Sequence, residues 1–182
     1  MVVVLLSLII VPITYKFVLR EYQRDRVKTF LDPGRDPRGS GYNSIQCRIA
    51  VGSGKVAGKG YLKGTQSLLN FIPEQHSDFI FSVYAEERGF LGGVVLLILY
   101  FFYCYFGLRT VGRARAKFEM LLGVGLTAIL FWHVFINIGM VIGILPIVGV
   151  TLPFFSYGGT SLITFMIITG LLLNLSRKRY IF

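Results

Sequence analysis

The sequence predicts an all-α membrane protein. Of its 182 residues, 54% are hydrophobic and 15% are aromatic, which is more apolar than an ordinary soluble domain. These residues form four long apolar runs separated by charged segments. A helix needs about 20 mostly apolar residues to cross a hydrocarbon core of roughly 30 Å, and each run approaches that length. We therefore predict four transmembrane helices and one large, structured extracytoplasmic loop.

The predicted segments follow the chain in order. They are a transmembrane helix at 1–18, an extracytoplasmic loop with short helices and the main polar cluster at 19–78, a transmembrane helix with a polar lead-in at 79–108, a cytoplasmic loop at 109–117, a transmembrane helix at 118–144, an extracytoplasmic turn at 145–153, a transmembrane helix at 154–175 and a cytoplasmic tail at 176–182. The first run is not interpreted as a signal peptide, because no basic region precedes it and no small-residue cleavage site follows it.

The charge pattern sets the orientation. The link 109–117 has Arg109, Arg113, Arg115 and Lys117 and no acidic residue, and the tail is also basic. Basic residues flank the cytoplasmic ends of membrane helices, so both segments face the cytoplasm, whereas a long loop such as 19–78 can cross despite its charge. Topology and anionic membrane lipids account for the formal net charge of +10, and we predict no nucleic-acid partner.

Ionisable residues gather just before the second apolar run. Glu74, His76 and Asp78 occupy alternating positions there. We expect Asp78 to cap the following helix, because a carboxylate accepts hydrogen bonds from the first free N–H groups of a helix and meets the positive end of its dipole. A cap explains one carboxylate, but it does not explain the cluster.

Three more ionisable residues, Glu86, Glu87 and Arg88, follow inside the apolar run. If the helix begins near Asp78, they lie about 12 Å along it. Charged groups at such depth usually face protein or a wet cavity. Two alternatives stay open: a polar cavity roofed by the outer loop, or an interfacial lead-in with the membrane helix starting at Gly89.

The glycine-rich stretch 52–60 carries Lys55 and Lys59. Such a stretch can cradle phosphate with backbone N–H groups, but it lacks the spacing of the known phosphate-binding fingerprints. A flexible loop is the equal alternative. Cys47 and Cys104 fall in the outer loop and in a span, so we predict no disulfide, and the absence of CxxC and HExxH patterns predicts no metal site made of protein ligands alone.

In the third run, His133 and Asn137 are spaced i, i+4 and share a helix face. We interpret His133 as a hydrogen-bonded packing residue rather than a catalyst. Pro146 and Pro153 then interrupt regular helix. Broken backbone at membrane depth is tolerated where it packs on protein or lines a cavity, so we expect this turn to pack under the long loop.

Three groups of motifs resemble one family. They are RVKTFLDP with GSGY, then GKGYLKGTQS with FIPEQHSDFIF and AEERG, and finally NIGM with GILP and LPFFSYGGTSL. In order and spacing they resemble the RodA/FtsW/SpoVE proteins (SEDS peptidoglycan glycosyltransferases) of bacterial elongation, division and sporulation. ILPIVGVTLP is closer to the elongation member RodA, with a division or sporulation role as the alternative.

The resemblance implies about ten transmembrane helices, of which this chain corresponds to the last four, so the isolated chain is expected to show little or no activity. It implies an enzyme of the bacterial inner membrane with its active site facing the periplasm. The implied reaction polymerises lipid II, an undecaprenyl-pyrophosphate-linked disaccharide pentapeptide, beside a class B penicillin-binding protein. The alternatives are a flippase or transporter of the lipid-linked precursor and a non-catalytic scaffold for a penicillin-binding protein.

The resemblance also assigns residues. The family's catalytic aspartate falls on Asp78, whose implied role is general base. Lys59, Gln66, Glu74 and His76 are predicted to contact sugar or pyrophosphate, and Glu86, Glu87, Arg88, Ser156 and Tyr157 are predicted to line the cavity. No cofactor is evident, and the sequence leaves open whether a divalent metal ion assists departure of the pyrophosphate. Asn70 stands where relatives often carry Glu, which puts a two-carboxylate mechanism in doubt, and Lys55 adds a charge where Gly is common and a backbone turn is expected.

Overall fold

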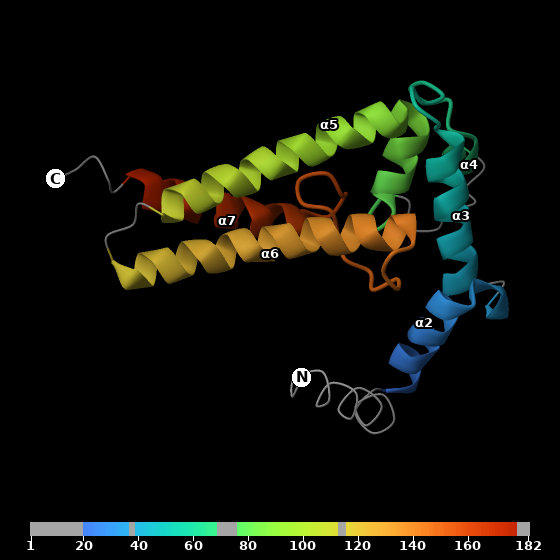
Figure 1. Ribbon diagram of the computed structural model, residues 1–182, viewed down its shortest axis with the longest axis horizontal. Coiled ribbons are helices and arrows are strands. Elements are labelled where there is room, and N and C mark those ends of the chain that lie inside the picture. The colour runs from blue at the N-terminus through green and yellow to red at the C-terminus, as the bar shows by residue number, and fades with distance from the viewer. Residues whose placement is uncertain (1–19, 37–38, 69–75, 113–115, 178–182) are drawn as a thin grey trace, which may run out of the picture.

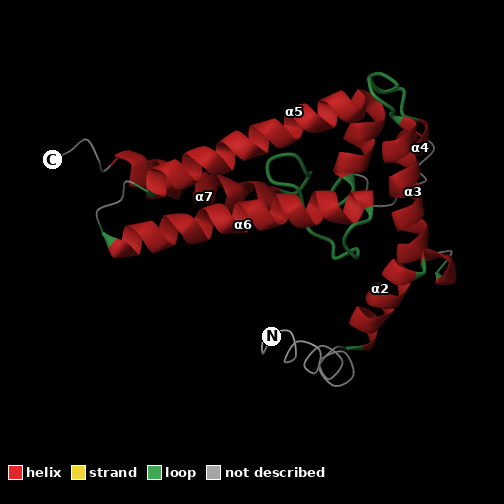
Figure 2. Ribbon diagram, in the orientation of Figure 1, coloured by secondary structure: helices red, strands yellow, loops and turns green. Residues whose placement is uncertain are grey.

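The computed structural model describes residues 20–36, 39–68, 76–112 and 116–177, and all regular structure in these ranges is helical (Figure 2). The elements are α2 (Glu21–Leu31), the 3-10 helix η2 (Pro33–Arg35), α3 (Ser40–Ser53), α4 (Thr65–Leu68), α5 (Ile80–Val111), α6 (Lys117–Ile142) and α7 (Gly159–Arg177). The predicted first span, 1–18, and the predicted contact Glu74 lie outside the described residues.

Three helices in the described ranges are long and apolar enough to cross a membrane: Ile80–Val111, Lys117–Ile142 and Gly159–Ser176, with mean hydropathies of 2.1, 2.0 and 1.6. The last one starts later than the 154–175 expected from the apolar run. The reason is a turn in which the N–H groups of Phe155 and Ser156 both donate to the Leu152 carbonyl. The protein is therefore a multi-pass, all-helical membrane protein.

The three long helices form a bundle. α5 and α6 run side by side, and α7 packs against both (Figure 1). α2 and α3 lie across one end of this bundle, where α5 begins and α6 ends, while α5 ends and α6 begins at the opposite end (Figure 1). The segment between α6 and α7 starts at the covered end, and its Ile147 and Val148 carbonyls accept from Arg26 of α2.

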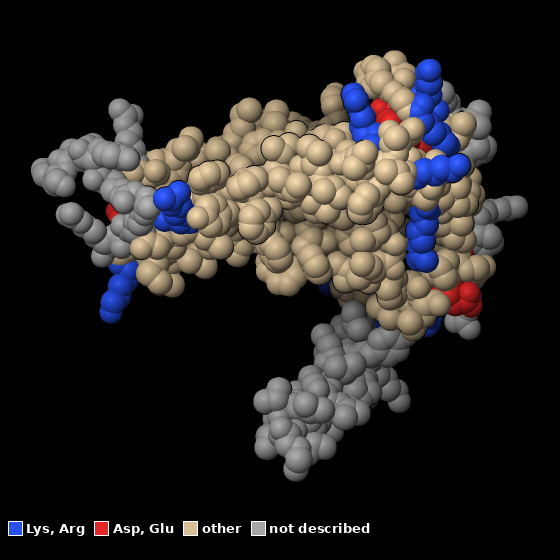
Figure 3. Space-filling view, turned by 45° about the horizontal axis from the view of Figure 1, so that its top comes forward, with Lys and Arg blue, Asp and Glu red and all other residues tan. Residues whose placement is uncertain are grey.

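Charge and burial follow this arrangement. Lys, Arg, Asp and Glu side chains gather toward the two ends, and the long flank of the bundle between them is tan in Figure 3. Exposed apolar side chains such as Phe101, Leu121 and Ile163 cover the long helices, as expected for helices that pass through a membrane.

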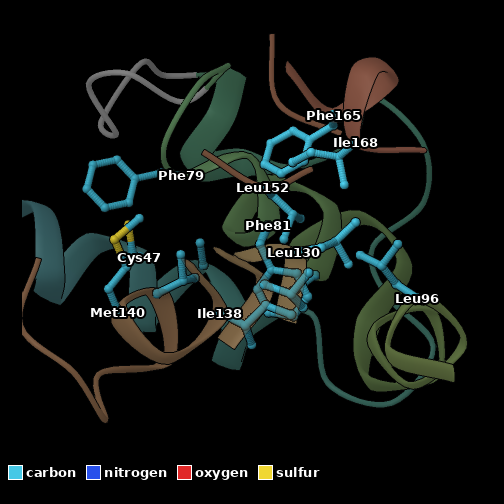
Figure 4. Close-up of a cluster of buried hydrophobic side chains, with 14 of the residues drawn as sticks. Cys47, Phe79, Phe81, Leu96, Leu130, Ile138, Met140, Leu152, Phe165 and Ile168 are labelled. Atoms are coloured by element: carbon cyan, nitrogen blue, oxygen red, sulfur yellow. The ribbon is translucent and has the colours of Figure 1, made fainter. Parts of the chain in front are cut away.

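A cluster of buried apolar side chains connects α3, α5, α6 and α7 at the end of the bundle that α3 covers (Figure 4). Cys47 of α3 lies near Phe79 and Met140, while Leu152, in the segment before α7, lies near Phe165 and Ile168 of α7 (Figure 4). Cys47, Met140, Leu152 and Phe165 are at most 1% exposed. Close packing of this kind fixes the elements that carry the polar cluster relative to one another.

Candidate active site

A sharp bend at Gly89 divides α5. Gly89 has φ of +68° and ψ of −164° inside an otherwise helical element, a conformation open in practice only to glycine. The chain therefore forms a short helical segment, 80–88, followed by the long apolar helix, and the two segments point in different directions in Figure 1. The break falls at Gly89, where one of the two alternatives for Glu86, Glu87 and Arg88 starts the membrane helix after an interfacial lead-in.

The glycine-rich loop packs directly on this bend. Lys59 and Gly60 donate their N–H groups to the carbonyls of Glu86 and Glu87, each at 3.0 Å, and the N–H groups of Phe90 and Leu91 donate back to Lys55 and Val56 at 2.9 and 3.1 Å. The loop is therefore paired with the bend, and the N–H groups of Lys59 and Gly60 are not available to cradle phosphate.

Two glycines make this approach possible. A β-carbon on Gly58 would lie 2.1 Å from the Glu87 carbonyl oxygen, and one on Gly89 would lie 2.3 Å from the Gly58 nitrogen. Both distances are far shorter than real carbon contacts, so only glycine allows the two backbones to pack this closely.

Glu86 is a fully buried carboxylate that holds the start of α4. Its Oε1 accepts from Lys59 Nζ at 2.6 Å, from the Thr65 N–H at 2.8 Å and hydroxyl at 3.0 Å, and from the Gln66 N–H at 3.2 Å. A buried charge is stable only when it is paired and hydrogen-bonded in this way. We name Glu86, Lys59, Thr65 and Gln66 the carboxylate latch.

The latch changes the interpretation of three predicted site residues. The Lys59 side chain, expected to contact substrate, is bonded to Glu86, whereas Gln66 contributes only its backbone N–H to this network. Glu86 itself points into this network. Glu87 is half-buried and its Oε1 accepts the Leu62 N–H at 3.1 Å, while Arg88 is exposed. Thr65, the first residue of α4, is a member that the sequence reasoning missed, because no pattern marks a single hydroxyl there.

Asp78 lies in the turn that precedes α5. The residue at the cap position of α5 is Phe79, so Asp78 lies one position before the cap that was predicted for it. Asp78 is half-buried, and its backbone carbonyl is held from another helix.

Asn137 of α6 provides that fixation. It is fully buried, and its Nδ2 donates to the Asp78 carbonyl at 2.8 Å and to the Val150 carbonyl at 2.6 Å. A β-carbon on Gly149 would lie 3.1 Å from Asp78 Oδ2, so the carboxylate lies beside the turn between α6 and α7. Sequence reasoning placed Asn137 on a helix face with His133, but no spacing rule connects it with Asp78, 59 residues away.

His76, Ser156 and Tyr157 belong to the same region. The Tyr157 N–H donates to the His76 carbonyl at 2.8 Å, which joins the turn before α5 to the turn before α7. Ser156 Oγ accepts the Leu152 N–H at 2.7 Å, a bond that closes its own turn. The Tyr157 ring is 84% exposed and is available for contact with another molecule.

His133 has a packing role. Its ring meets Phe165 edge-on at 5.0 Å between centroids, and its Nδ1 lies 3.4 Å from the Thr151 carbonyl oxygen. The described residues contain no group of three or more His, Cys, Asp or Glu side chains placed to hold a metal ion.

The structure therefore separates the predicted residues into two centres on the 80–88 segment. Asp78, His76 and Tyr157 lie at its start, and the carboxylate latch lies near its end, about 12 Å along a helix. A half-buried carboxylate on a rigid backbone can accept a proton from a hydroxyl group. The saturated Glu86 cannot easily do so, because its Oε1 is already occupied by donors.

Comparison with known proteins places this arrangement in a family. The family model FtsW/RodA/SpoVE, described as "Cell cycle protein", matches residues 1–181. The chain is 49% identical to peptidoglycan glycosyltransferase MrdB of Escherichia coli (strain K12), over 98% of this chain and 48% of that protein. It is 42% identical to peptidoglycan glycosyltransferase RodA of Treponema pallidum (strain Nichols), over 89% of this chain and 37% of that protein.

A solved structure is also similar. A chain in the structure described as "Structural coordination of polymerization and crosslinking by a peptidoglycan synthase complex" matches with a TM-score of 0.75 and 34% identity, over 100% of this chain and 50% of that chain. The present chain spans about half the length of that chain and of MrdB, and less of RodA. The motifs, the helical arrangement and these matches agree: the chain belongs to the FtsW/RodA/SpoVE family.

Proposed function

We propose that this chain forms the catalytic part of a peptidoglycan glycosyltransferase of the cell-elongation machinery, which polymerises lipid II into glycan strands. The names of the relatives support this reaction. The observation that carries the proposal is the position of Asp78 at one end of the membrane bundle. Asp78 is half-buried, and Asn137 donates a hydrogen bond to its backbone carbonyl.

In the proposed reaction Asp78 acts as general base. The hydroxyl oxygen of the acceptor sugar attacks the anomeric carbon of the donor, and its proton passes to the Asp78 carboxylate. The bond between the anomeric carbon and the lipid pyrophosphate breaks, and the pyrophosphate leaves with the electron pair. Contacts from His76 and from the exposed Tyr157 ring to the sugars are proposed from their position beside Asp78.

We assign this end of the bundle to the extracytoplasmic side of the bacterial inner membrane. The opposite end carries the basic link with Arg109 and Lys117, which favours the cytoplasm. The proposed partner is a class B penicillin-binding protein. This assignment is supported by the similarity to a chain from a complex whose description couples polymerization with crosslinking.

A transporter function has no comparable support. That alternative required Glu86, Glu87 and Arg88 to line a path for an anionic lipid. Glu86 is fully buried and bonded to Lys59 at 2.6 Å, so the pair presents no free charge to a passing headgroup.

The test uses a chimera in which this chain replaces the segment of Escherichia coli MrdB that it matches. Purified with a class B penicillin-binding protein and supplied with lipid II, the chimera is expected to produce glycan strands. A second arm measures lipid II flipping in vesicles. A monodisperse chimera that binds its partner and flips lipid II but forms no glycan would contradict the proposed enzyme and favour the transporter.

A further inference from the structure

The loop that packs on the Gly89 bend carries apolar side chains in the open. Val56, Tyr61 and Leu62 are 61%, 69% and 63% exposed. Lys55 and Lys63, at either side of this stretch, are exposed as well. Exposed apolar groups that gather beside charges mark a surface that contacts a partner or a membrane.

Backbone pairing fixes the level of this loop along the bundle. The N–H groups of Phe90 and Leu91 donate to Lys55 and Val56, so the loop lies beside the first turn of the long apolar part of α5. Phe90 and Leu91 are themselves 68% and 58% exposed. We call Val56, Tyr61, Leu62, Phe90 and Leu91, with Lys55, Lys63 and Arg88 at the edge, the loop patch.

The loop patch continues into the exposed apolar surface of α5. Val95, Ile98 and Leu99 follow along the same apolar helix and are exposed, and Figure 3 shows Lys and Arg side chains grouped at an end of the long tan surface. The patch thus lies where the hydrocarbon core meets the headgroups. Tyrosine is typical of this level, and basic side chains there reach lipid phosphates while their stems remain among apolar groups.

The charges of the patch favour an anionic surface. Lys55, Lys63 and Arg88 are exposed, whereas the anion Glu87 is half-buried and accepts the Leu62 N–H. Glu86 and Lys59 neutralise each other nearby. The exposed cations therefore outnumber the carboxylate of Glu87.

We propose that the loop patch sits in the headgroup region of the bilayer and binds anionic phospholipid headgroups. Val56, Tyr61 and Leu62 enter the interface, and Lys55, Lys63 and Arg88 contact the phosphates. Because the loop is hydrogen-bonded to residues 86–91, this contact fixes the Gly89 bend, and with it the carboxylate latch, at the level of the membrane surface. The proposal concerns lipid binding and does not depend on the proposed catalytic activity.

The depth of the loop is measured by fluorescence in the full chain. Tyr61→Trp is combined with Trp132→Phe, which leaves a single tryptophan, and the protein is placed in nanodiscs with phospholipids brominated at shallow or deep acyl positions. Shallow bromines are expected to quench the introduced tryptophan more than deep ones. The native Trp132, near the middle of α6, is expected to show the opposite order in the parent chain.

The charge requirement is measured in the same nanodiscs with brominated phosphatidylglycerol diluted in phosphatidylcholine. Lys55→Gln with Lys63→Gln is expected to reduce the local enrichment of phosphatidylglycerol by up to about fivefold for each lysine removed. The matched control, Arg20→Gln with Lys28→Gln, removes the same charge from α2 and its N-cap and is expected to leave quenching unchanged.

Three results would overturn the proposal. The first is an introduced tryptophan that no bromolipid quenches, and the second is equal loss of phosphatidylglycerol quenching in both double variants. The third is quenching that appears only in zwitterionic lipid and disappears when a class B penicillin-binding protein is added, which would make the patch a protein interface. Thermal unfolding of each variant in detergent verifies that the fold is kept.

Discussion

Asn137 is a fully buried amide in the membrane helix α6, and its Nδ2 donates to two carbonyls outside that helix. One carbonyl belongs to Asp78 and the other to Val150, so a single side chain joins the turn before α5 to the turn before α7. At the scale of the residue, the position of the proposed base therefore depends on a group that takes no part in the chemistry.

Replacing this amide tests that dependence. Asn137→Ala leaves the carbonyls of Asp78 and Val150 without their donor, which is expected to cost about 1–3 kcal/mol. In the chimera, we expect the rate of glycan formation to fall while the KM for lipid II changes little, because Asp78 loses its alignment. Asn174→Ala, at an exposed position of α7, is the control. Equal effects of the two substitutions would refute the positioning role.

Cys47 gives a second prediction at this scale. Burial raises the pKa of its thiol to about 12, so at pH 8 the thiol stays protonated and is a poor nucleophile. In a Cys104→Ser background, we expect maleimide to leave the folded chain unlabelled at pH 8 and to label it fully after unfolding in SDS. Labelling of the folded chain at the rate of a free thiol would show that Cys47 is accessible.

At the scale of the element, α5 depends on Gly89. Alanine there must adopt a positive φ and place its β-carbon 2.3 Å from the Gly58 nitrogen, so we expect Gly89→Ala to cost more than about 2 kcal/mol. Gly125→Ala on α6 is the matched control, since a β-carbon there meets nothing within 4 Å and alanine favours helix. The measurement is the midpoint of thermal unfolding of each variant in detergent. An unchanged midpoint for Gly89→Ala would contradict the claim that the bend requires glycine.

The carboxylate latch connects α5 to the glycine-rich loop through Lys59 and to the first residues of α4. Glu86→Ala leaves Lys59 beside a site without its anion, and breaking a buried pair in this way costs about 3–5 kcal/mol. We expect Lys59→Met to recover part of that loss in the double variant, because the uncompensated cation is then removed. The measurement is the free energy of unfolding in mixed micelles for the four members of the cycle. Strict additivity of the two substitutions would show that the pair is not coupled.

Hydropathy predicts the long helices of this chain but not the bend within one of them. Apolar runs determine where a helix can enter lipid, so 79–108 and 118–144 lie close to α5 and α6. Nothing in the letters around Arg88 and Gly89 distinguishes a bend from a continuous helix, because the bend depends on a loop about thirty residues earlier. The turn at 152–156 likewise delays α7 until Gly159.

For the whole molecule, the polar end of the bundle combines segments that are distant in sequence. Motif resemblance singled out Asp78, and spacing put Asn137 on one face with His133, but only the fold brings Asn137 to Asp78. The family resemblance predicts substrate contacts for Lys59 and Gln66, and it does not predict Glu86 as the partner of the Lys59 side chain and of the Gln66 N–H. These bonds join residues 27 and 20 positions apart and have no sequence pattern.

The central claim is that Asp78 takes the proton from the acceptor sugar. The measurement that tests it most directly is glycan formation from purified lipid II by the chimera carrying Asp78→Asn, beside the control Asp25→Asn on the exposed face of α2. Asparagine cannot accept the proton, so we expect a loss of about 10²–10⁴-fold with folding and partner binding retained, and no loss in the control. Glycan formation by Asp78→Asn at the rate of the parent chimera would contradict the claim.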